Sequence, residues 1–276
     1  MGIFDGVLLA TDFDETLCAR GGYISAADRS ALLRFTEQGG LFTVATGRPL
    51  RTFLPFADDL PLTAPAVLSN GAMLFDFAAG EAVACRLLPD TIRADAMTLA
   101  ERFPSMALEL YVGLQAVAVR PNHATRLHAL RVRCGYREIT LARLPADCLK
   151  LILEDREPVL HRAQDFIRTV WGDRYEAVFS SPILLELTAP GCSKGAAVLD
   201  LAERLGVDQE HIYCVGDNQN DLTMLQAARQ GFCPANATAE VLAAGMCPVG
   251  PGGDGCLRDV VDLLTKRYAH RKGDLS

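Results

Sequence analysis

The sequence predicts an α/β fold with a mostly parallel sheet, into which an α+β segment is inserted. Two observations predict the sheet: short, uninterrupted apolar runs recur near both ends of the chain, and a helical pattern follows most of them closely. A third observation predicts the insertion, because the middle of the chain resembles antiparallel strand pairs more than a strand–helix alternation.

The first part of the chain predicts a strand, a helix and two further strands. Residues 7–10 form a continuous apolar run, which suits a strand that is buried on both faces. Ser25 is a good N-cap for a helix, and Gly39-Gly40 ends that helix. Residues 41–45 and 66–68 are the next predicted strands. Short connections between these elements predict right-handed βαβ units.

The last part of the chain returns to the same alternation. In chain order, the patterns predict a helix at 196–205, a strand at 212–215, a helix at 221–229, a strand at 232–233, and helices at 237–244 and 257–268.

The middle of the chain predicts a separate α+β unit. Residues 107–111 and 115–119 flank Gly113 and alternate as the strands of a hairpin do. Further on, the patterns predict a strand at 149–154, a helix at 158–171, and strands at 177–179 and 184–187. We therefore predict a core domain made of residues 1–82 and 188–276, with a second domain, residues 83–187, inserted into it.

Composition excludes several classes of protein. The chain of 276 residues is 50% hydrophobic and carries a net charge of −7, which argues against nucleic acid as its main partner. No apolar run reaches the ~20 residues of a membrane helix, and the first residues lack the features of a secretion signal. The nine cysteines include no Cys-x-x-Cys pair and histidine is scarce, which argues against zinc and for a reducing compartment. We expect a cytoplasmic protein.

Two carboxylates, Asp12 and Asp14, directly follow the first predicted strand. The carboxyl ends of parallel strands are where ligands bind in open α/β sheets. Residues two apart in an extended segment point the same way, so the pair favours a divalent cation between them. Solvated turn residues are the alternative for this pair taken alone.

A second acidic pair, Asp217 and Asp221, follows the predicted strand at 212–215. Asp221 can be explained as a helix N-cap, whereas Asp217 has no such explanation. Together with Asp12 and Asp14, these residues predict an oxygen-rich site for Mg²⁺.

Two further segments supply groups that suit a phosphate. Thr46-Gly47-Arg48 follows the strand at 41–45, and a Thr hydroxyl with backbone N–H groups near a Gly turn can hold a phosphoryl oxygen. Lys194 begins a predicted helix, from which its ammonium could reach the same edge, although a lone Lys at such a position is usually solvated.

These segments, in this order, resemble the four motifs of the haloacid dehalogenase superfamily: Asp12-x-Asp14-x-Thr16, Thr46-Gly47-Arg48, Lys194-Gly195 and Gly216-Asp217-x-x-x-Asp221. Finer marks are similar to its Cof-type phosphatase branch, subfamily IIB: Ala45-Thr46-Gly47-Arg48-Pro49, Asn70-Gly71-Ala72, Gly191-Cys192-Ser193-Lys194-Gly195, Gly216-Asp217-Asn218-Gln219-Asn220-Asp221 and Asn236-Ala237. The resemblance covers nearly the whole chain. It implies a Rossmann-like core of three layers, and it makes the insertion at 83–187 a cap that sets substrate specificity.

The resemblance also implies an activity, namely Mg²⁺-dependent hydrolysis of a small phosphomonoester such as a sugar phosphate or a cofactor phosphate. Asp12 would be the nucleophile that forms an aspartyl-phosphate, and Asp14 the general acid and base. Thr46 and Lys194 would offset charge on the phosphoryl oxygens. Mg²⁺ would be held by Asp12, Asp14 and Asp217, with Asn220 and Asp221 outside them, and substrate by Thr46, Gly47, Arg48, Asn70 and Lys194.

Two other functions stay open from the sequence. A phosphomutase shares the first motif, and a non-catalytic regulator that binds a phosphometabolite would lack a motif carboxylate, whereas all of them are intact. One position departs from the branch, because Glu15 stands where glycine is common. If that position needs a positive φ, Glu is strained there by about 1 kcal/mol. The charge of Glu15 could face the cap and select against doubly charged leaving groups, or Glu15 could face solvent and have no role.

Overall fold

The computed structural model describes residues 2–145 and 147–273, which form two compact units. Of the described residues, 2–46, 56–83 and 193–273 belong to the first unit, and the second consists of Gly47–Pro55 and Ala84–Cys192. The short segment Gly47–Pro55 groups with the second unit, which the sequence patterns did not suggest.

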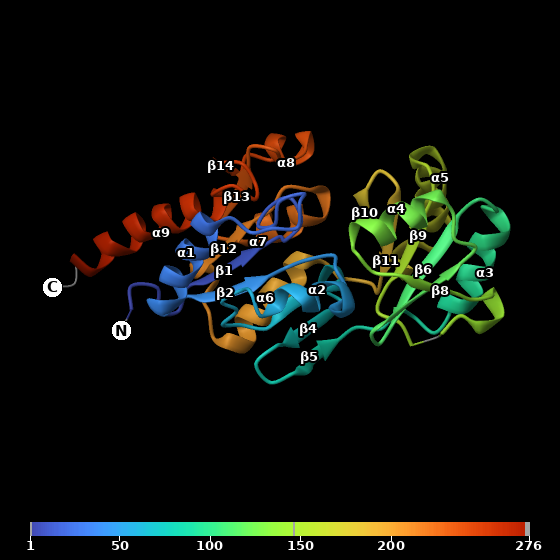
Figure 1. The fold of residues 1–276 in the computed structure, drawn as a ribbon, viewed down its shortest axis with the longest axis horizontal. Coiled ribbons are helices and arrows are strands. Elements are labelled where there is room, and N and C mark those ends of the chain that lie inside the picture. Colours follow the sequence, from blue (N-terminus) through green and yellow to red (C-terminus); the bar gives the residue numbers. More distant parts are fainter. Residues whose placement is uncertain (1, 146, 274–276) are drawn as a thin grey trace. The chain divides into compact units, whose positions relative to one another are not determined.

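The first unit contains a five-stranded parallel sheet (Figure 1). Its strands, in spatial order, are β14 (Cys247–Val249), β13 (Gln230–Pro234), β12 (Ile212–Val215), β1 (Leu8–Thr11) and β2 (Leu41–Val44). Every residue of β1 and β12 is buried, as the continuous apolar runs predicted. The predicted α/β class with a mostly parallel sheet is confirmed.

Helices cover both faces of this sheet. In Figure 1, α1 (Ala26–Glu37) and α9 (Cys256–Gly273) run side by side along one face, while α6 (Lys194–Leu205) lies on the other. The first unit also contains α7 (Leu222–Ala227) and α8 (Ala239–Ala243). Ser25 accepts a hydrogen bond from the backbone N–H of Asp28, which makes it the predicted N-cap of α1.

Two predicted elements differ from the structure. Residues 66–68 do form a strand, β3 (Ala66–Leu68), but it makes only one parallel bridge to the end of β2 and begins an antiparallel sheet with β4 (Met73–Asp76) and β5 (Glu81–Cys85). The helix predicted at 221–229 is also too long, because Ala228 is already extended and Gln230 begins β13.

The second unit contains a six-stranded sheet. Its strands, in spatial order, are β10 (Glu176–Ser181), β11 (Leu184–Thr188), β9 (Leu151–Glu154), β6 (Ala107–Val112), β7 (Gln115–Val119) and β8 (Tyr136–Glu138). Only the pair β7–β8 is parallel. The hairpin predicted around Gly113 is present as β6 and β7, and Gly113 takes the positive φ of 55° that its turn requires.

The two faces of this sheet are covered differently. One face packs against α3 (Ile92–Arg102) and α5 (Glu157–Trp171) and forms the apolar core of the unit, with Leu108, Leu153 and Leu185 among its members. The short helix α4 (His123–Arg131) packs on the opposite face, on which several polar strand residues lie. This opposite face therefore buries charge as well as apolar surface.

The remaining helices are short. They are α2 (Leu50–Ala57) and the 3-10 turns η1 (Ser69–Gly71), η2 (Leu141–Arg143), η3 (Gly172–Arg174), η4 (Gln209–His211) and η5 (Gln219–Asp221). Within the described part of the chain, no helix is long and apolar enough to cross a bilayer.

Candidate active site

Asp12 and Asp14 leave the carboxyl end of β1, as the sequence predicted. The backbone N–H of Asp12 donates to the carbonyl of Val215 at 2.8 Å, so β1 and β12 still pair at the residue where the site begins. The side chain of Asp12 is buried, and that of Asp14 is half-buried. The parallel sheet thus brings Asp12 to the edge that also carries Asp217.

Lys194 joins two of the carboxylates. Its ammonium lies 2.6 Å from Asp12 Oδ1 and 2.6 Å from Asp221 Oδ1, and its side chain is only 1% exposed. Ser193 caps the N-terminus of α6 and thereby fixes where Lys194 leaves the helix. Lys194 is therefore a buried member of the cluster, and a solvated surface position is excluded.

Asp221 contacts Lys194 and the loop of Asp217, and its side chain does not cap α7. Its Oδ1 pairs with Lys194, and its Oδ2 accepts the backbone N–H groups of Asp217 and Asn218 at 3.0 and 2.9 Å. It makes no side-chain capping bond to α7. A Cβ at Gly216 would lie 2.5 Å from the Cβ of Asp221, so any residue other than glycine at this position would clash with the Asp221 side chain. Asp221 consequently orients the loop that carries Asp217.

Asp217 has a partner that sequence reasoning missed. The hydroxyl of Thr16 donates to Asp217 Oδ1 at 2.6 Å, and both side chains are buried. In the sequence, Thr16 is a member of the first motif with no predicted role. Its position two residues after Asp14 is the one sign that it lies near the site. The contact with Asp217 could not be predicted, because the two residues are 201 positions apart in the chain.

The cluster holds more negative than positive charge. Burial raises the pKa of Asp12 well above its ordinary value; Lys194 acts in the opposite direction, while the charges of Asp221, Asp217 and Asp14 add to the rise. Burial, followed by the charge of Asp221, also raises the pKa of Asp217 to about 6. One ammonium therefore does not neutralise the site.

The donor set fits a divalent cation. Asp12, Asp217 and Asp221 each offer a carboxylate oxygen, and these oxygens lie within 4.8 Å of one another. Both carboxylate oxygens of Asp221 are already engaged, Oδ1 by Lys194 and Oδ2 by two backbone N–H groups. Lys194 and Thr16 contact only Oδ1 of Asp12 and Oδ1 of Asp217, so these two residues are the better placed ligands. Hard cations such as Mg²⁺ are bound in this way, through one or two carboxylates.

The predicted substrate-binding residues of the first unit lie in the next loops. Thr46 is buried after β2, and its carbonyl accepts the backbone N–H of Asn70 at 3.0 Å. Asn70 takes a left-handed φ of 55°, and its Oδ1 accepts from the side-chain amide of Asn220 at 3.1 Å. The structure thus connects Thr46, Asn70 and Asn220 by direct contacts.

Gly47 and Arg48 follow Thr46 directly but group with the second unit. The carbonyl of Gly47 accepts from the ammonium of Lys150 at 2.6 Å, and Lys150 also pairs with Glu186 at 2.7 Å. Arg48 is largely buried and donates to the carbonyl of Thr52. These contacts hold the loop in place.

Glu15 has the backbone conformation that the sequence comparison suggested. Its φ is +64°, a left-handed value that favours glycine. Its carboxylate is held by Arg20, which donates from Nε and from Nη2 at 3.0 and 2.9 Å. Arg20 thus offsets the negative charge of Glu15 at this position.

Comparison with known proteins shows the family. Residues 9–248 match the model of haloacid dehalogenase-like hydrolases. The HMP-PP phosphatase of Cronobacter sakazakii is 27% identical over 238 residues, which cover 85% of this chain and 86% of that protein. The 5-amino-6-(5-phospho-D-ribitylamino)uracil phosphatase YwtE of Bacillus subtilis is 25% identical over 261 residues, covering 84% and 89%.

Solved structures agree on the fold. A sugar phosphatase described as subclass IIB of the superfamily superposes with a TM-score of 0.80 at 18% identity, covering 95% of this chain and 99% of that one. The family match spans both acidic pairs and the lysine between them. The chain therefore belongs to the haloacid dehalogenase-like hydrolases, as its motifs predicted, and it is an enzyme of their phosphatase class.

Proposed function

We propose that this phosphatase hydrolyses a small phosphomonoester with the help of Mg²⁺, through an aspartyl-phosphate formed on Asp12. The observation that carries the proposal is the pairing of Lys194 with both Asp12 and Asp221, inside a buried cluster that also contains Asp217. This arrangement fixes one carboxylate and leaves the cluster short of positive charge, which suits a site for a cation and a phosphate.

Asp12 would act as the nucleophile. A carboxylate oxygen of Asp12 attacks the phosphorus, the ester P–O bond breaks, and the leaving alkoxide takes the proton of the Asp14 carboxyl. Water then gives a proton to the Asp14 carboxylate and attacks the same phosphorus. The bond between Asp12 and phosphorus breaks, which restores Asp12 and releases phosphate.

Mg²⁺ would be held by the side chains of Asp12 and Asp217 and by the backbone carbonyl of Asp14. When bound, the ion supplies positive charge that allows Asp12 and an anionic phosphate to approach each other. Thr16 and Asp221 would hold the Asp217 carboxylate and its loop in place, because both contact it directly. Asn220 would support the same shell from outside.

Thr46 and Lys194 would offset the charge on the oxygens of the transferring phosphoryl group. Lys194 already stands against Asp12 Oδ1, so its charge is close to the atom that attacks. Thr46 is buried at the end of the adjacent strand. Gly47, Arg48 and Asn70 complete the proposed substrate-binding set.

The substrate class is a small phosphorylated metabolite, namely a sugar phosphate or a cofactor phosphate. The relatives act on HMP-PP and on a phosphorylated ribitylaminouracil, by their names. The inserted domain at 83–187, which overlaps most of the second unit, is the proposed cap that selects among such substrates. Residues 1–82 and 188–276 are the proposed catalytic core.

The test is release of phosphate from p-nitrophenyl phosphate and from a panel of phosphomonoesters. We expect activity that EDTA abolishes and Mg²⁺ restores, and that Asp12→Asn removes. Asp58→Asn, which changes an exposed aspartate, is the matched control. Conversion of a hexose phosphate into an isomer without free phosphate would support a phosphomutase instead, and binding without turnover would support a regulator.

A further inference from the structure

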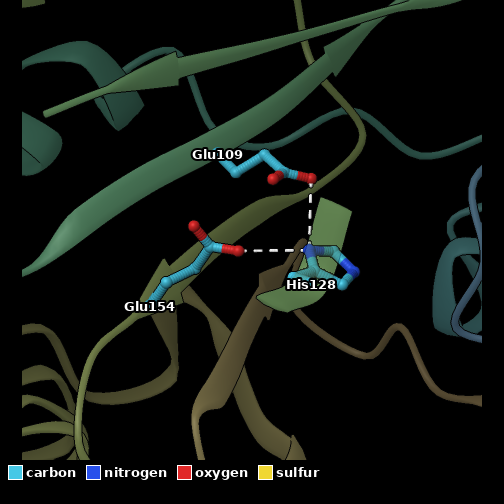
Figure 2. A group of neighbouring side chains, drawn as sticks. All are labelled: Glu109, His128 and Glu154. Carbon is cyan, nitrogen blue, oxygen red and sulfur yellow. Dashed lines mark hydrogen bonds and ion pairs between the residues drawn. The ribbon is translucent and has the colours of Figure 1, made fainter. Parts of the chain in front are cut away.

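The second unit contains a buried group of three ionisable side chains that the proposed chemistry does not use. Glu109 lies on β6, Glu154 ends β9, and His128 projects from α4 (Figure 2). His128 Nδ1 lies 3.1 Å from Glu154 Oε1 and 3.4 Å from Glu109 Oε1. All three side chains are nine-tenths buried or more. Figure 2 shows both carboxylates turned toward the same imidazole.

One carboxylate oxygen of this group, Glu154 Oε2, is buried without a hydrogen-bond partner. Glu109 Oε1 also makes no hydrogen bond, and its contact with His128 Nδ1 is an ion pair of 3.4 Å. A buried acceptor that lacks a donor costs free energy, more so when it carries charge, and native proteins rarely leave one in this state. Glu154 Oε2 takes no part in the pairs that define the group, so it is a separate observation, and it points to a positively charged ligand.

The charge balance leads to the same conclusion. The group places two carboxylates beside a single imidazole in a buried position, and burial raises the pKa of the Glu154 carboxyl. In the described part of the chain neither Glu109 nor Glu154 pairs with a lysine or arginine, and Lys150, which precedes β9, is engaged by Glu186. A divalent ion in place of the imidazole proton would make the group neutral.

We propose that Glu109, His128 and Glu154 bind a divalent transition-metal ion, for which Zn²⁺ is the closest chemical match. Imidazole nitrogen and carboxylate oxygen are established zinc ligands, at about 2.0–2.2 Å, which places ligand atoms of a tetrahedral site roughly 3.4 Å apart. The observed separations of 3.1 and 3.4 Å are close to this value. The donor set contains no cysteine, so the lack of cysteine pairs in the sequence does not argue against it.

Binding would join three elements of the second unit. Glu109 and Glu154 stand on the adjacent strands β6 and β9, and His128 is the point at which α4 meets them. The ion would therefore hold α4 on the polar face of the sheet. The site shares no residue with the Asp12 cluster, so the inference is independent of the proposed reaction.

The test is the zinc content of the full-length protein. Protein stripped with EDTA is given excess Mg²⁺ and then ZnCl₂, desalted, and measured by mass spectrometry of the metal. Asp217→Asn removes a ligand of the proposed catalytic ion, and we expect this variant to retain one zinc ion per chain. The double variant Asp217→Asn/His128→Gln should bind no zinc. The control, Asp217→Asn/His161→Gln, changes an exposed histidine and should keep the zinc ion.

A second readout covers the stability of the fold. Zn²⁺ should raise the melting temperature of the Asp217→Asn protein by about 3 °C or more, and should have no such effect once His128→Gln is added. Zinc content that is the same with and without His128→Gln, or an Asp217→Asn protein that binds no zinc, would overturn the inference.

Where His128→Gln does not fold, cobalt decides the question. Co²⁺ added to the Asp217→Asn protein should give the strong visible absorption of a four-coordinate ion. Only the weak spectrum of six-coordinate aqueous Co²⁺ would rule out the site.

Discussion

The ammonium of Lys194 donates to Asp12 Oδ1 over 2.6 Å, although the two residues are 182 positions apart in the chain. The contact exists because α6 begins at Lys194, directly after its N-cap Ser193, and because β1 ends at Thr11. It neutralises part of a buried carboxylate cluster and fixes the side chain that we propose as the nucleophile.

Replacing Lys194 should nearly abolish turnover. Lys194→Met removes a buried positive charge from Asp12 and Asp221, and removal of one electrostatic contact of this kind costs about 100- to 1,000-fold in kcat. Steady-state phosphate release at saturating Mg²⁺ measures the loss. The control is Lys266→Met, which changes an exposed lysine and should retain full activity. Activity of Lys194→Met within a few-fold of the parent would contradict this role.

Removing the hydroxyl of Thr16 should weaken the metal. Thr16→Val leaves the Asp217 carboxylate without the donor that lies 2.6 Å away, and partners of metal ligands typically contribute about 10- to 100-fold in affinity. The Mg²⁺ concentration that gives half-maximal activity should rise by about this factor, while kcat at saturating Mg²⁺ changes little. An unchanged half-saturation point would mean that Thr16 does not support the ion.

The left-handed backbone at Glu15 predicts a stabilising substitution. Glu15→Gly should raise the free energy of unfolding by about 1 kcal/mol, because glycine adopts a φ of +64° without strain. Glu15→Ala is the matched variant, since it also loses the exposed Arg20 pair but keeps the strain. Urea denaturation compares the three proteins. Equal stability of the Gly and Ala variants would show that the backbone is not strained.

The metal-free protein should lose stability as the pH rises. Burial alone would lower the pKa of His128, but hydrogen bonds and charges from Glu109 and Glu154 raise it from 6.5 to about 9. Tyr111 is a further titratable group, which interacts with both carboxylates and has Cys134 as a neighbour. The folded state therefore holds the His128 proton more tightly than the unfolded state, and this stabilisation is complete below pH 6.5 and lost as the pH passes 9.

The change is on the order of 3 kcal/mol at most. Thermal unfolding in EDTA between pH 6 and 10 measures it, and His128→Gln should flatten the profile over that range. A wild-type profile as flat as that of the variant would refute the effect.

The sequence predicted the sheet and the motif residues because their signals are local. Apolar runs mark β1 and β12, and the acidic residues stand directly after them, so topology alone brings Asp12 near Asp217. The burial of Lys194 and its double pairing could not be predicted in this way. They depend on how α6 packs, and a lysine that begins a helix has the same sequence pattern whether it is buried or solvated.

Other features depended on contacts across long stretches of chain. Thr16 meets Asp217 only in the folded protein, and β3 joins an antiparallel sheet because Met73–Asp76 pairs with it, which a three-residue apolar run does not indicate. One missed signal was local. Glu109 and Glu154 are single charged residues within apolar strands, and a charge in such a place is buried only with a partner.

The proposed mechanism requires that Asp12 becomes covalently phosphorylated. Enzyme mixed with excess substrate and Mg²⁺, and quenched in acid within the first turnover, should yield the peptide that contains Asp12 with one added phosphoryl group. The adduct should disappear in Asp12→Asn and survive in Asp58→Asn. Phosphate release that persists in Asp12→Asn, or turnover in which the Asp12 peptide never carries the phosphoryl group, would contradict the account.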